Sequence, residues 1–201
     1  MTKQTVYLLR HGEATSNVQR IWTFKGSLTQ TGRAQARYWG DYFRDKKLTV
    51  IYASTVTRTT QTAKLISRAV KLTVTASRDI VEANGGKFME HSVDLQGKRD
   101  IEEKLFSAWE KGEWTVSYPI GESFADIKSR LERLVEKFPE SGTLLVVSHQ
   151  MPIAVFLWAF CSNHPATFVD CMVSRASMVR LERVGNKSFK IRQLNVKPQI
   201  A

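Results

Sequence analysis

Two arginines and two histidines are of the residue types needed to break a phosphate ester without a metal ion. That reaction requires cations around the phosphoryl oxygens, a nucleophile in line with the departing oxygen, and an acid for the leaving group. Arg10 and Arg58 supply planar guanidinium groups that match phosphate oxygens and stay charged at any working pH. His11 and His149 supply imidazoles, one to attack and the other to bind. These residues predict phosphoryl-transfer chemistry.

We expect His11 to be the attacking group. An imidazole attacks phosphorus only when it is neutral, and nearby guanidinium groups favour the neutral form because they disfavour a further positive charge. Gly12 follows directly, and its missing side chain would let a phosphate approach the backbone closely. The expected intermediate is a phosphohistidine. Taken singly, His149 could equally be a hydrogen-bonded core residue, and Arg58 a solvated side chain in a first helical turn.

Three β-prone runs place these residues at the ends of predicted strands. The runs cover residues 5–9, 50–53 and 143–147. Arg10 follows the first run and His149 follows the third, while a helical pattern over 56–70 after the second carries Arg58 in its first turn. Open α/β sheets bind ligands at the carboxyl ends of their strands. The sequence therefore predicts that these side chains meet at one edge of a sheet.

The other segments indicate a single α/β domain. Further predicted elements are helices over 30–47 and 122–138 and a terminal hairpin over 176–183 and 188–194. Thr29 and Thr31 are both candidate N-caps of the first of these helices. Residues 84–120 have weak periodicity and predict a cap that carries specificity. We expect a three-layer αβα sandwich with a mainly parallel sheet, formed as one domain by residues 1–201.

Composition narrows the class of protein. With 201 residues and 42% apolar content, the chain can close one sizeable core. Cys161 and Cys171 lack metal-binding spacing, which argues against a disulfide framework or a structural zinc site. The N-terminus lacks the features of a signal peptide, and the apolar run 153–161 is far shorter than the roughly 20 residues of a membrane span. We expect a soluble cytoplasmic protein that needs no cofactor or metal and does not contact a membrane.

The strong positive charge leaves several partners open. Thirty basic and 19 acidic side chains give a net charge of +11, which attracts anions. The partner could be a nucleic acid, an acidic surface or a phosphorylated metabolite, and a merely solvated surface is the alternative. Five residues could extend a positive field around the site, namely Arg20, Lys25, Lys87, Lys98 and Arg99. Such a field would favour substrates with more than one phosphate or with an added carboxylate.

The sequence resembles one known family. Residues 8–17, Leu-Leu-Arg-His-Gly-Glu-Ala-Thr-Ser-Asn, resemble the signature of the histidine phosphatase superfamily in its phosphoglycerate-mutase-like branch, branch 1. Further matches follow in order: Leu28-Thr29 with Gly32 and Gln35-Ala36, Ser54 with Arg58, Gly121-Glu122-Ser123, and Val147-Ser148-His149. The pattern runs from residue 5 to about residue 160. It implies that His11 is phosphorylated, that Arg10, Arg58 and His149 hold the phosphoryl group, and that Asn17 is a further donor.

The resemblance also implies a proton donor and shows two departures. In this family an acidic residue after a short apolar strand donates the proton, and Ile80-Val81-Glu82 matches that position. Where relatives carry an Asp before Leu-Thr, this chain has Lys25-Gly26-Ser27, which puts a positive charge near the mouth. The usual acidic-glycine pair is replaced by Met89-Glu90, so Glu90 is a rival to Glu82.

We therefore expect a metal-independent phosphatase that hydrolyses a small phosphorylated metabolite through a phosphohistidine. The alternative within the family is a phosphoglycerate or phosphosugar mutase, which returns the phosphoryl group to the substrate. An alternative of another class is a non-catalytic module that binds phosphate or nucleic acid. The chain shows no aromatic-basic motif of the RNA-binding type, so we do not expect a nucleic-acid partner. The natural substrate and the oligomeric state stay open.

Overall fold

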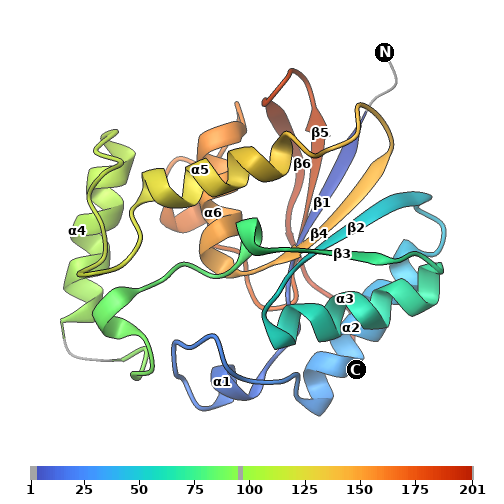
Figure 1. Cartoon of the computed structure of the whole chain (residues 1–201), viewed down its shortest axis with the longest axis horizontal. Coiled ribbons are helices and arrows are strands. Elements are labelled where there is room, and N and C mark those ends of the chain that lie inside the picture. Colours follow the sequence, from blue (N-terminus) through green and yellow to red (C-terminus); the bar gives the residue numbers. More distant parts are fainter. Residues whose placement is uncertain (1–3, 95–96, 201) are drawn as a thin grey trace.

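A mixed sheet of six strands lies at the centre of the computed structural model, which describes residues 4–94 and 97–200 (Figure 1). The strand order is β3-β2-β4-β1-β5-β6. The first four in that order are parallel, whereas β5 and β6 are antiparallel to their neighbours. The strands are β1 Thr5–Arg10, β2 Leu48–Ser54, β3 Val74–Ser77, β4 Thr143–Ser148, β5 Met178–Arg183 and β6 Phe189–Val196. The predicted, mainly parallel sheet is confirmed.

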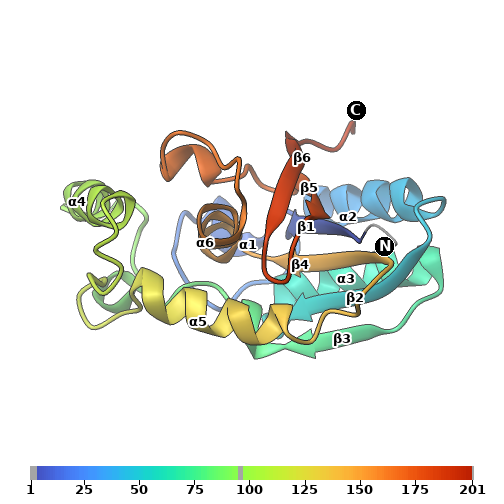
Figure 2. The ribbon, with the colours of Figure 1, turned by 90° about the horizontal axis from the view of Figure 1, so that it is seen from above.

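Helices cover both faces of this sheet (Figure 2). α2 Gln30–Phe43 and α3 Thr57–Val70 lie on one face, and α5 Phe124–Val135 and α6 Gln150–Phe160 lie on the other. The other two helices are α1 Thr15–Val18 and α4 Lys98–Glu110. Successive side chains of a strand point to opposite faces. Tyr7 and Leu9 of β1 accordingly join a core cluster with α2 and α3, while Val6 and Leu8 join the cluster that contains α5 and α6. The predicted αβα sandwich is confirmed.

The carboxyl ends of three strands meet at one edge, as the sequence predicted. Arg10 at the end of β1 is in register with Ser148 at the end of β4. Val147 of β4 is in turn in register with Ala53 of β2, one residue before that strand ends at Ser54. The residues that follow these strands are therefore delivered to the same place.

The C-terminal hairpin returns the chain to this edge. β5 runs antiparallel to β1, and Met178 at its start is opposite Leu9. A strand that is antiparallel to β1 begins at the edge where β1 ends, so the loop before β5 lies beside the end of β1. The loop is tied to β1 by backbone hydrogen bonds from Arg10 N–H to the Ser177 oxygen at 3.0 Å and from Ala176 N–H to the His11 oxygen at 3.1 Å. The predicted hairpin is confirmed.

Several element boundaries differ from the predictions. The helix predicted over 30–47 begins after its N-cap Thr29, whose hydroxyl accepts the Gly32 N–H at 3.0 Å, but it ends at Phe43. Lys47 has a φ of +50°, which a right-handed helix does not accommodate. Residues 80 and 81 are not a strand. A single 3-10 turn, Arg78–Ile80, follows β3, and Glu82 comes after it.

Segment 84–120 contains a helix that its weak periodicity did not reveal. α4 (Lys98–Glu110) stands apart from the sheet, beyond α5 and α6 (Figure 2). Its first two turns are mostly charged, and its buried apolar side chains are concentrated in its second half, at Leu105, Phe106 and Trp109. The helix is anchored through these three residues.

The most apolar segment of the chain is a buried helix. α6 has eight buried residues among its eleven, because the sheet covers one side and α5 and Phe168 lie against others. A helix that is apolar all round is expected when it is enclosed in this way. Within residues 4–94 and 97–200, no helix has the length and apolar character that crossing a bilayer requires.

Candidate active site

His11 is held in one tautomer by the backbone. Its Nδ1 lies 2.7 Å from the carbonyl oxygen of Gly12, and a carbonyl only accepts, so Nδ1 carries the proton. Nε2 then has a free lone pair, and Arg58 Nε donates to it at 3.0 Å. Burial lowers the pKa of His11 well below its ordinary value, and the charges of Arg58 and Arg10 lower it further. The imidazole is neutral, with Nε2 as its nucleophilic atom.

The glycine after His11 has a different role from the one we predicted. A Cβ on Gly12 would lie 2.5 Å from the carbonyl oxygen of Gly32, at the start of α2, so bulk is excluded by the helix and not by a ligand. Its N–H is also bonded, donating to Thr62 Oγ1 at 3.2 Å. The close contact between Gly12 and Gly32 fixes the backbone whose carbonyl orients His11.

Arg58 is fixed by four hydrogen bonds. It lies in the first turn of α3, and one end of its guanidinium donates to the backbone oxygens of Thr23 at 3.0 Å and Lys25 at 3.1 Å. Its Nε and NH2 reach His11 and His149. Burial lowers the pKa of Arg58, and the negative charge of Glu82 opposes that effect. A buried cation at a helix N-terminus opposes the helix dipole, so a bound anion would stabilise it.

His149 lies behind His11 and does not line the cavity. It is fully buried, and the two imidazole rings meet edge to face with centroids 5.1 Å apart. Nδ1 lies 3.3 Å from Arg58 NH2, which only donates, so Nε2 carries the proton and donates to Ser54 Oγ at 2.9 Å. Burial lowers the pKa of His149 well below its ordinary value, and neighbouring His11 and Arg58 contribute. In this arrangement His149 orients Arg58.

Arg10 reaches the cavity from the end of β1. Its NH1 donates to the Val173 oxygen at 2.8 Å, while its buried Nε has no partner within the described part of the chain. Burial lowers the pKa of Arg10 to about 10, opposed by the negative charge of Glu82 and assisted by the positive charge of Arg175. A buried guanidinium nitrogen without a partner is costly, which favours an anionic ligand at this position.

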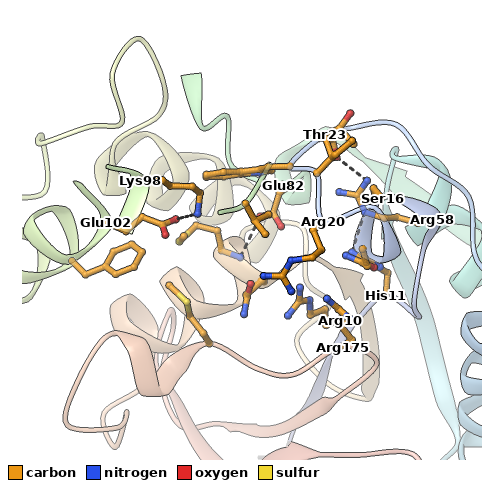
Figure 3. A pocket seen from close by; sticks show the side chains of 18 residues that line it. Arg10, His11, Ser16, Arg20, Thr23, Arg58, Glu82, Lys98, Glu102 and Arg175 are labelled. Atoms are coloured by element: carbon orange, nitrogen blue, oxygen red, sulfur yellow. Dashed lines mark hydrogen bonds and ion pairs between the residues drawn. The ribbon is translucent and has the colours of Figure 1, made fainter. Parts of the chain in front are cut away.

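Of the two candidate acids, only Glu82 faces the cavity (Figure 3). Its Oε1 accepts the backbone N–H groups of Ala83 at 3.0 Å and Met151 at 3.2 Å. Glu90 instead binds Thr23 and the exposed Lys25, and these contacts lower the pKa of its carboxyl. The rival carboxylate is therefore engaged outside the cavity.

Asn17 also lines the cavity, but its oxygen is used locally. Asn17 Oδ1 accepts the Ala14 N–H at 2.9 Å, in a capping arrangement at the start of α1. A loop asparagine commonly satisfies its own turn in this way. The amide nitrogen has no such local partner in the described chain and is the part that can donate into the cavity.

The cavity is about 370 Å³ in volume and extends from His11 to α4. Six apolar side chains also line it: Ile21, Trp22, Val93, Phe106, Met151 and Met172. Lys98 and Glu102 of α4 also line it and form an ion pair of 2.7 Å. The end at His11, Arg10 and Arg58 is positive, and we call it the phosphoryl end after the predicted chemistry. The end at α4, where the Lys98–Glu102 pair and Phe106 lie, is called the cap end.

Two of the five cations that were predicted to surround the site line the cavity. Arg20 and Lys98 line the cavity, whereas Lys25, Lys87 and Arg99 do not. Lys25 Nζ lies 3.2 Å from Glu90 Oε2, so the positive charge that departs from the family pattern is paired. Arg175 also lines the cavity and was not among the predicted site residues. Arg175 lies directly before the predicted hairpin that starts at residue 176, but no local sequence signal pairs that hairpin with β1.

No group of three or more His, Cys, Asp or Glu side chains with metal-binding geometry occurs in residues 4–94 and 97–200. The cavity instead presents cationic side chains to a ligand. Arg10 and Arg58 are both within electrostatic reach of His11, and their charges act on its pKa. An anion seated against these two guanidinium groups would lie next to His11 Nε2.

Known proteins share this sequence pattern and fold. A family model described as "Histidine phosphatase superfamily (branch 1)" matches residues 6–197. The "Probable phosphoglycerate mutase GpmB" of Erwinia tasmaniensis is 31% identical over 157 residues, which cover 76% of this chain and 72% of that protein. A mycobacterial glucosyl-3-phosphoglycerate phosphatase solved with VO3 is similar in structure, with a TM-score of 0.76 and 19% identity over 96% of this chain and 99% of that one. The alpha-ribazole phosphatase of Shigella flexneri is also similar in structure, with a TM-score of 0.71 and 23% sequence identity. The match covers 95% of this chain and 96% of that one.

Proposed function

Because the chain belongs to branch 1 of the histidine phosphatase superfamily, we propose that it is a metal-independent phosphatase of a small phosphorylated metabolite. The observation that carries the proposal is the fixed tautomer of His11, whose Nε2 lone pair faces Arg58. Two of the similar structures are phosphatases of small phosphorylated compounds by name, which supports hydrolysis as the reaction. Arg10 and Arg58 supply the positive charge that the phosphoryl oxygens require.

In the first step the phosphoryl group moves to His11. The guanidinium groups of Arg10 and Arg58 hold the phosphoryl oxygens. Arg58 then no longer donates to His11 Nε2, so the lone pair of Nε2 is free to attack. The bond from Nε2 to phosphorus forms while the ester P–O bond breaks. Glu82, protonated at the start, gives its proton to the leaving oxygen. The Gly12 carbonyl accepts the hydrogen bond from Nδ1–H throughout, and it stabilises the positive charge that develops on the ring.

In the second step water removes the phosphoryl group. Glu82, now a carboxylate, takes a proton from water while the water oxygen bonds to phosphorus and the bond from phosphorus to Nε2 breaks. The products are an alcohol and inorganic phosphate, and both His11 and Glu82 return to their starting protonation states. The two backbone N–H groups on Oε1 keep the Glu82 side chain in place, so that Oε2 carries the proton.

A mutase is the second candidate function, favoured by the sequence match to a relative named as a phosphoglycerate mutase. The first step would be the same, and the phosphohistidine would return its phosphoryl group to the substrate instead of to water. Isomerisation of a phosphorylated acid, measured in a coupled assay, distinguishes the two. Isomerisation faster than phosphate release would replace the phosphatase proposal by the mutase.

The proposal is tested by phosphate release from an aryl phosphate in the presence of EDTA. We expect EDTA-resistant activity in the wild type and its loss in His11→Ala. When the reaction of a ³²P-labelled substrate is stopped rapidly without acid, the wild-type protein should carry the label. The labelled bond should be labile in acid and stable in base, as expected of a phosphohistidine. A folded wild type that is inactive on every ester would refute the proposal. We also propose a cytoplasmic location, with which the buried free thiols of Cys161 and Cys171 are compatible.

A further inference from the structure

The geometry points to Arg175 as a specificity residue that binds a carboxylate on the leaving-group side of the substrate. The inference rests on the proposed phosphatase function and goes beyond it, because it names the class of substrate. The preferred substrates would be phosphomonoesters whose alcohol also carries one carboxylate.

Backbone hydrogen bonds attach the loop that carries Arg175 to the end of β1, where Arg10 and His11 lie. The residue after it, Ala176, donates its N–H to the His11 oxygen at 3.1 Å and accepts from Trp39 Nε1 at 2.7 Å. Val173, two residues before it, accepts from Arg10 NH1. Figure 3 shows Arg175 next to Arg10 at the phosphoryl end of the cavity, which both side chains line. The loop therefore fixes the base of the side chain, and its guanidinium reaches the space beside the phosphoryl position.

Apart from Arg10 and Arg58, which would hold the phosphoryl group, the other two cations that line the cavity already have anionic partners. Arg20 forms two hydrogen bonds with the carboxylate of Asp94, at 2.7 and 2.8 Å. Lys98 pairs with Glu102 at 2.7 Å. For Arg175, in contrast, no carboxylate of residues 4–94 and 97–200 lies within 4.0 Å. Its charge is also close enough to Arg10 and His11 to lower the pKa of both.

A charge balance identifies the missing partner. A phosphoryl dianion neutralises Arg10 and Arg58, and Glu82 is neutral when it is ready to donate its proton. One positive charge, that of Arg175, then stays unbalanced. A single carboxylate matches it both in charge and in the planar, two-oxygen geometry that a guanidinium binds best. A second phosphoryl dianion would exceed the available positive charge.

The test compares esters that differ only in this group. We would measure kcat/KM for three esters: 2-phosphoglycolate, which carries the carboxylate, 2-hydroxyethyl phosphate, which carries a hydroxyl group instead, and ethane-1,2-diyl bisphosphate, which carries a second phosphate. Each is measured with the wild type, Arg175→Gln and Arg180→Gln. Arg180 is the matched control, since it is an exposed arginine of β5 outside the cavity and its replacement removes the same charge. We expect the wild type to prefer phosphoglycolate over the hydroxyethyl ester, and Arg175→Gln to lower that preference about tenfold. Arg180→Gln should keep it.

Different results would overturn the inference or the function separately. An equal fall for all esters in Arg175→Gln would make Arg175 a general electrostatic residue, and a loss confined to the bisphosphate would exclude the carboxylate. If no ester is hydrolysed, the proposed function fails, and the inference is then tested by calorimetric binding of the same two monophosphates to the wild type and Arg175→Gln. A binding preference that Arg175→Gln abolishes would sustain the inference, and equal affinities would end it.

Discussion

The two ends of the cavity are held in different ways. At the phosphoryl end, backbone carbonyls position the side chains: Gly12 holds His11, Thr23 and Lys25 hold Arg58, and Val173 holds Arg10. At the cap end the polar contacts join side chains to each other, as in the Lys98–Glu102 pair of α4. Lys98 Nζ also lies 5.1 Å from the centre of the Trp22 ring.

The difference shows how one molecule can combine fixed chemistry with adjustable recognition. Backbone carbonyls that belong to a sheet edge or to the turns beside it cannot move without breaking other hydrogen bonds, so the reacting groups are preorganised. Contacts between side chains can rearrange at lower cost, because each partner has several rotamers. We therefore expect substitutions of His11, Arg58 and Arg10, which the backbone carbonyls hold, to change the rate for every ester. Substitutions at the cap end should change which ester is preferred.

The largest effect is expected from His11→Ala. Removal of the nucleophile should lower kcat by about 10⁴-fold or more for all esters, because the remaining residues can bind phosphate but cannot form the covalent intermediate. His164→Ala is the control, since His164 is an exposed histidine outside the cavity. Phosphate release and circular dichroism check activity and folding. A well-folded His11→Ala that retains a tenth of the activity would remove the proposed difference between the two ends.

Glu82→Gln should have the next largest effect, and one that depends on the leaving group. Loss of the acid should lower kcat/KM about 10²- to 10⁴-fold for an alkyl phosphate, which needs a proton on its leaving oxygen. The loss should be much smaller for 4-nitrophenyl phosphate, whose leaving group departs without one. Glu90→Gln, at the rival carboxylate outside the cavity, should stay within about twofold of wild type. Equal losses for both esters would argue that Glu82 only supports the structure.

The neutral histidines of the phosphoryl end predict a pH dependence of stability. Because the folded protein lowers the pKa of His11 and His149 well below 6.5, the unfolded chain takes up protons below that pH while the folded chain does not. The free energy of unfolding should therefore be highest above pH 6.5 and fall below it, by up to about 1.4 kcal/mol per pH unit for each histidine.

Urea unfolding between pH 7 and pH 5 measures this slope, in a range above the titration of ordinary carboxyl groups. His11→Ala removes one of the two contributions and should reduce the slope. A free energy of unfolding that stays constant or rises on acidification across this range would contradict the assignment of two buried neutral imidazoles.

The phosphoryl end was largely predictable from the sequence. Arg10 directly follows the apolar strand run 5–9, and one residue separates His149 from the run 143–147. Arg58 lies in the first helical turn after the run 50–53. These local patterns were enough to predict that the three residues meet at one edge of the sheet. What the sequence could not show is which of these side chains line the cavity and which lie behind them. That His149 lies behind His11 and orients Arg58, instead of lining the cavity, depends on side-chain packing between distant segments.

The cap end was much less predictable, for physical reasons. α4 is anchored by a few apolar residues in its second half, and its charged first half hides the helical period. Lys98 has the character of a surface residue, yet it is only 8% exposed because Glu102 and Trp22 lie against it. At the phosphoryl end the exception was Arg175, which comes to the site through the pairing of an antiparallel strand. Local sequence patterns do not specify such pairings.

The smallest effect is expected at the cap, from Phe106→Leu. Phe106 lines the cavity from α4, so a smaller side chain should change KM a few-fold for esters with a large apolar group and leave kcat for a small ester such as 2-hydroxyethyl phosphate unchanged. Phe138→Leu is a matched control, because both rings are 7% exposed and Phe138 lies outside the cavity. Each variant should lose about 1 kcal/mol of stability, checked by urea unfolding. A change of KM shared by both variants would show that lower stability, and not the cap wall, sets the preference. A fall in kcat for the small ester in Phe106→Leu alone would show that the cap also positions the reacting groups.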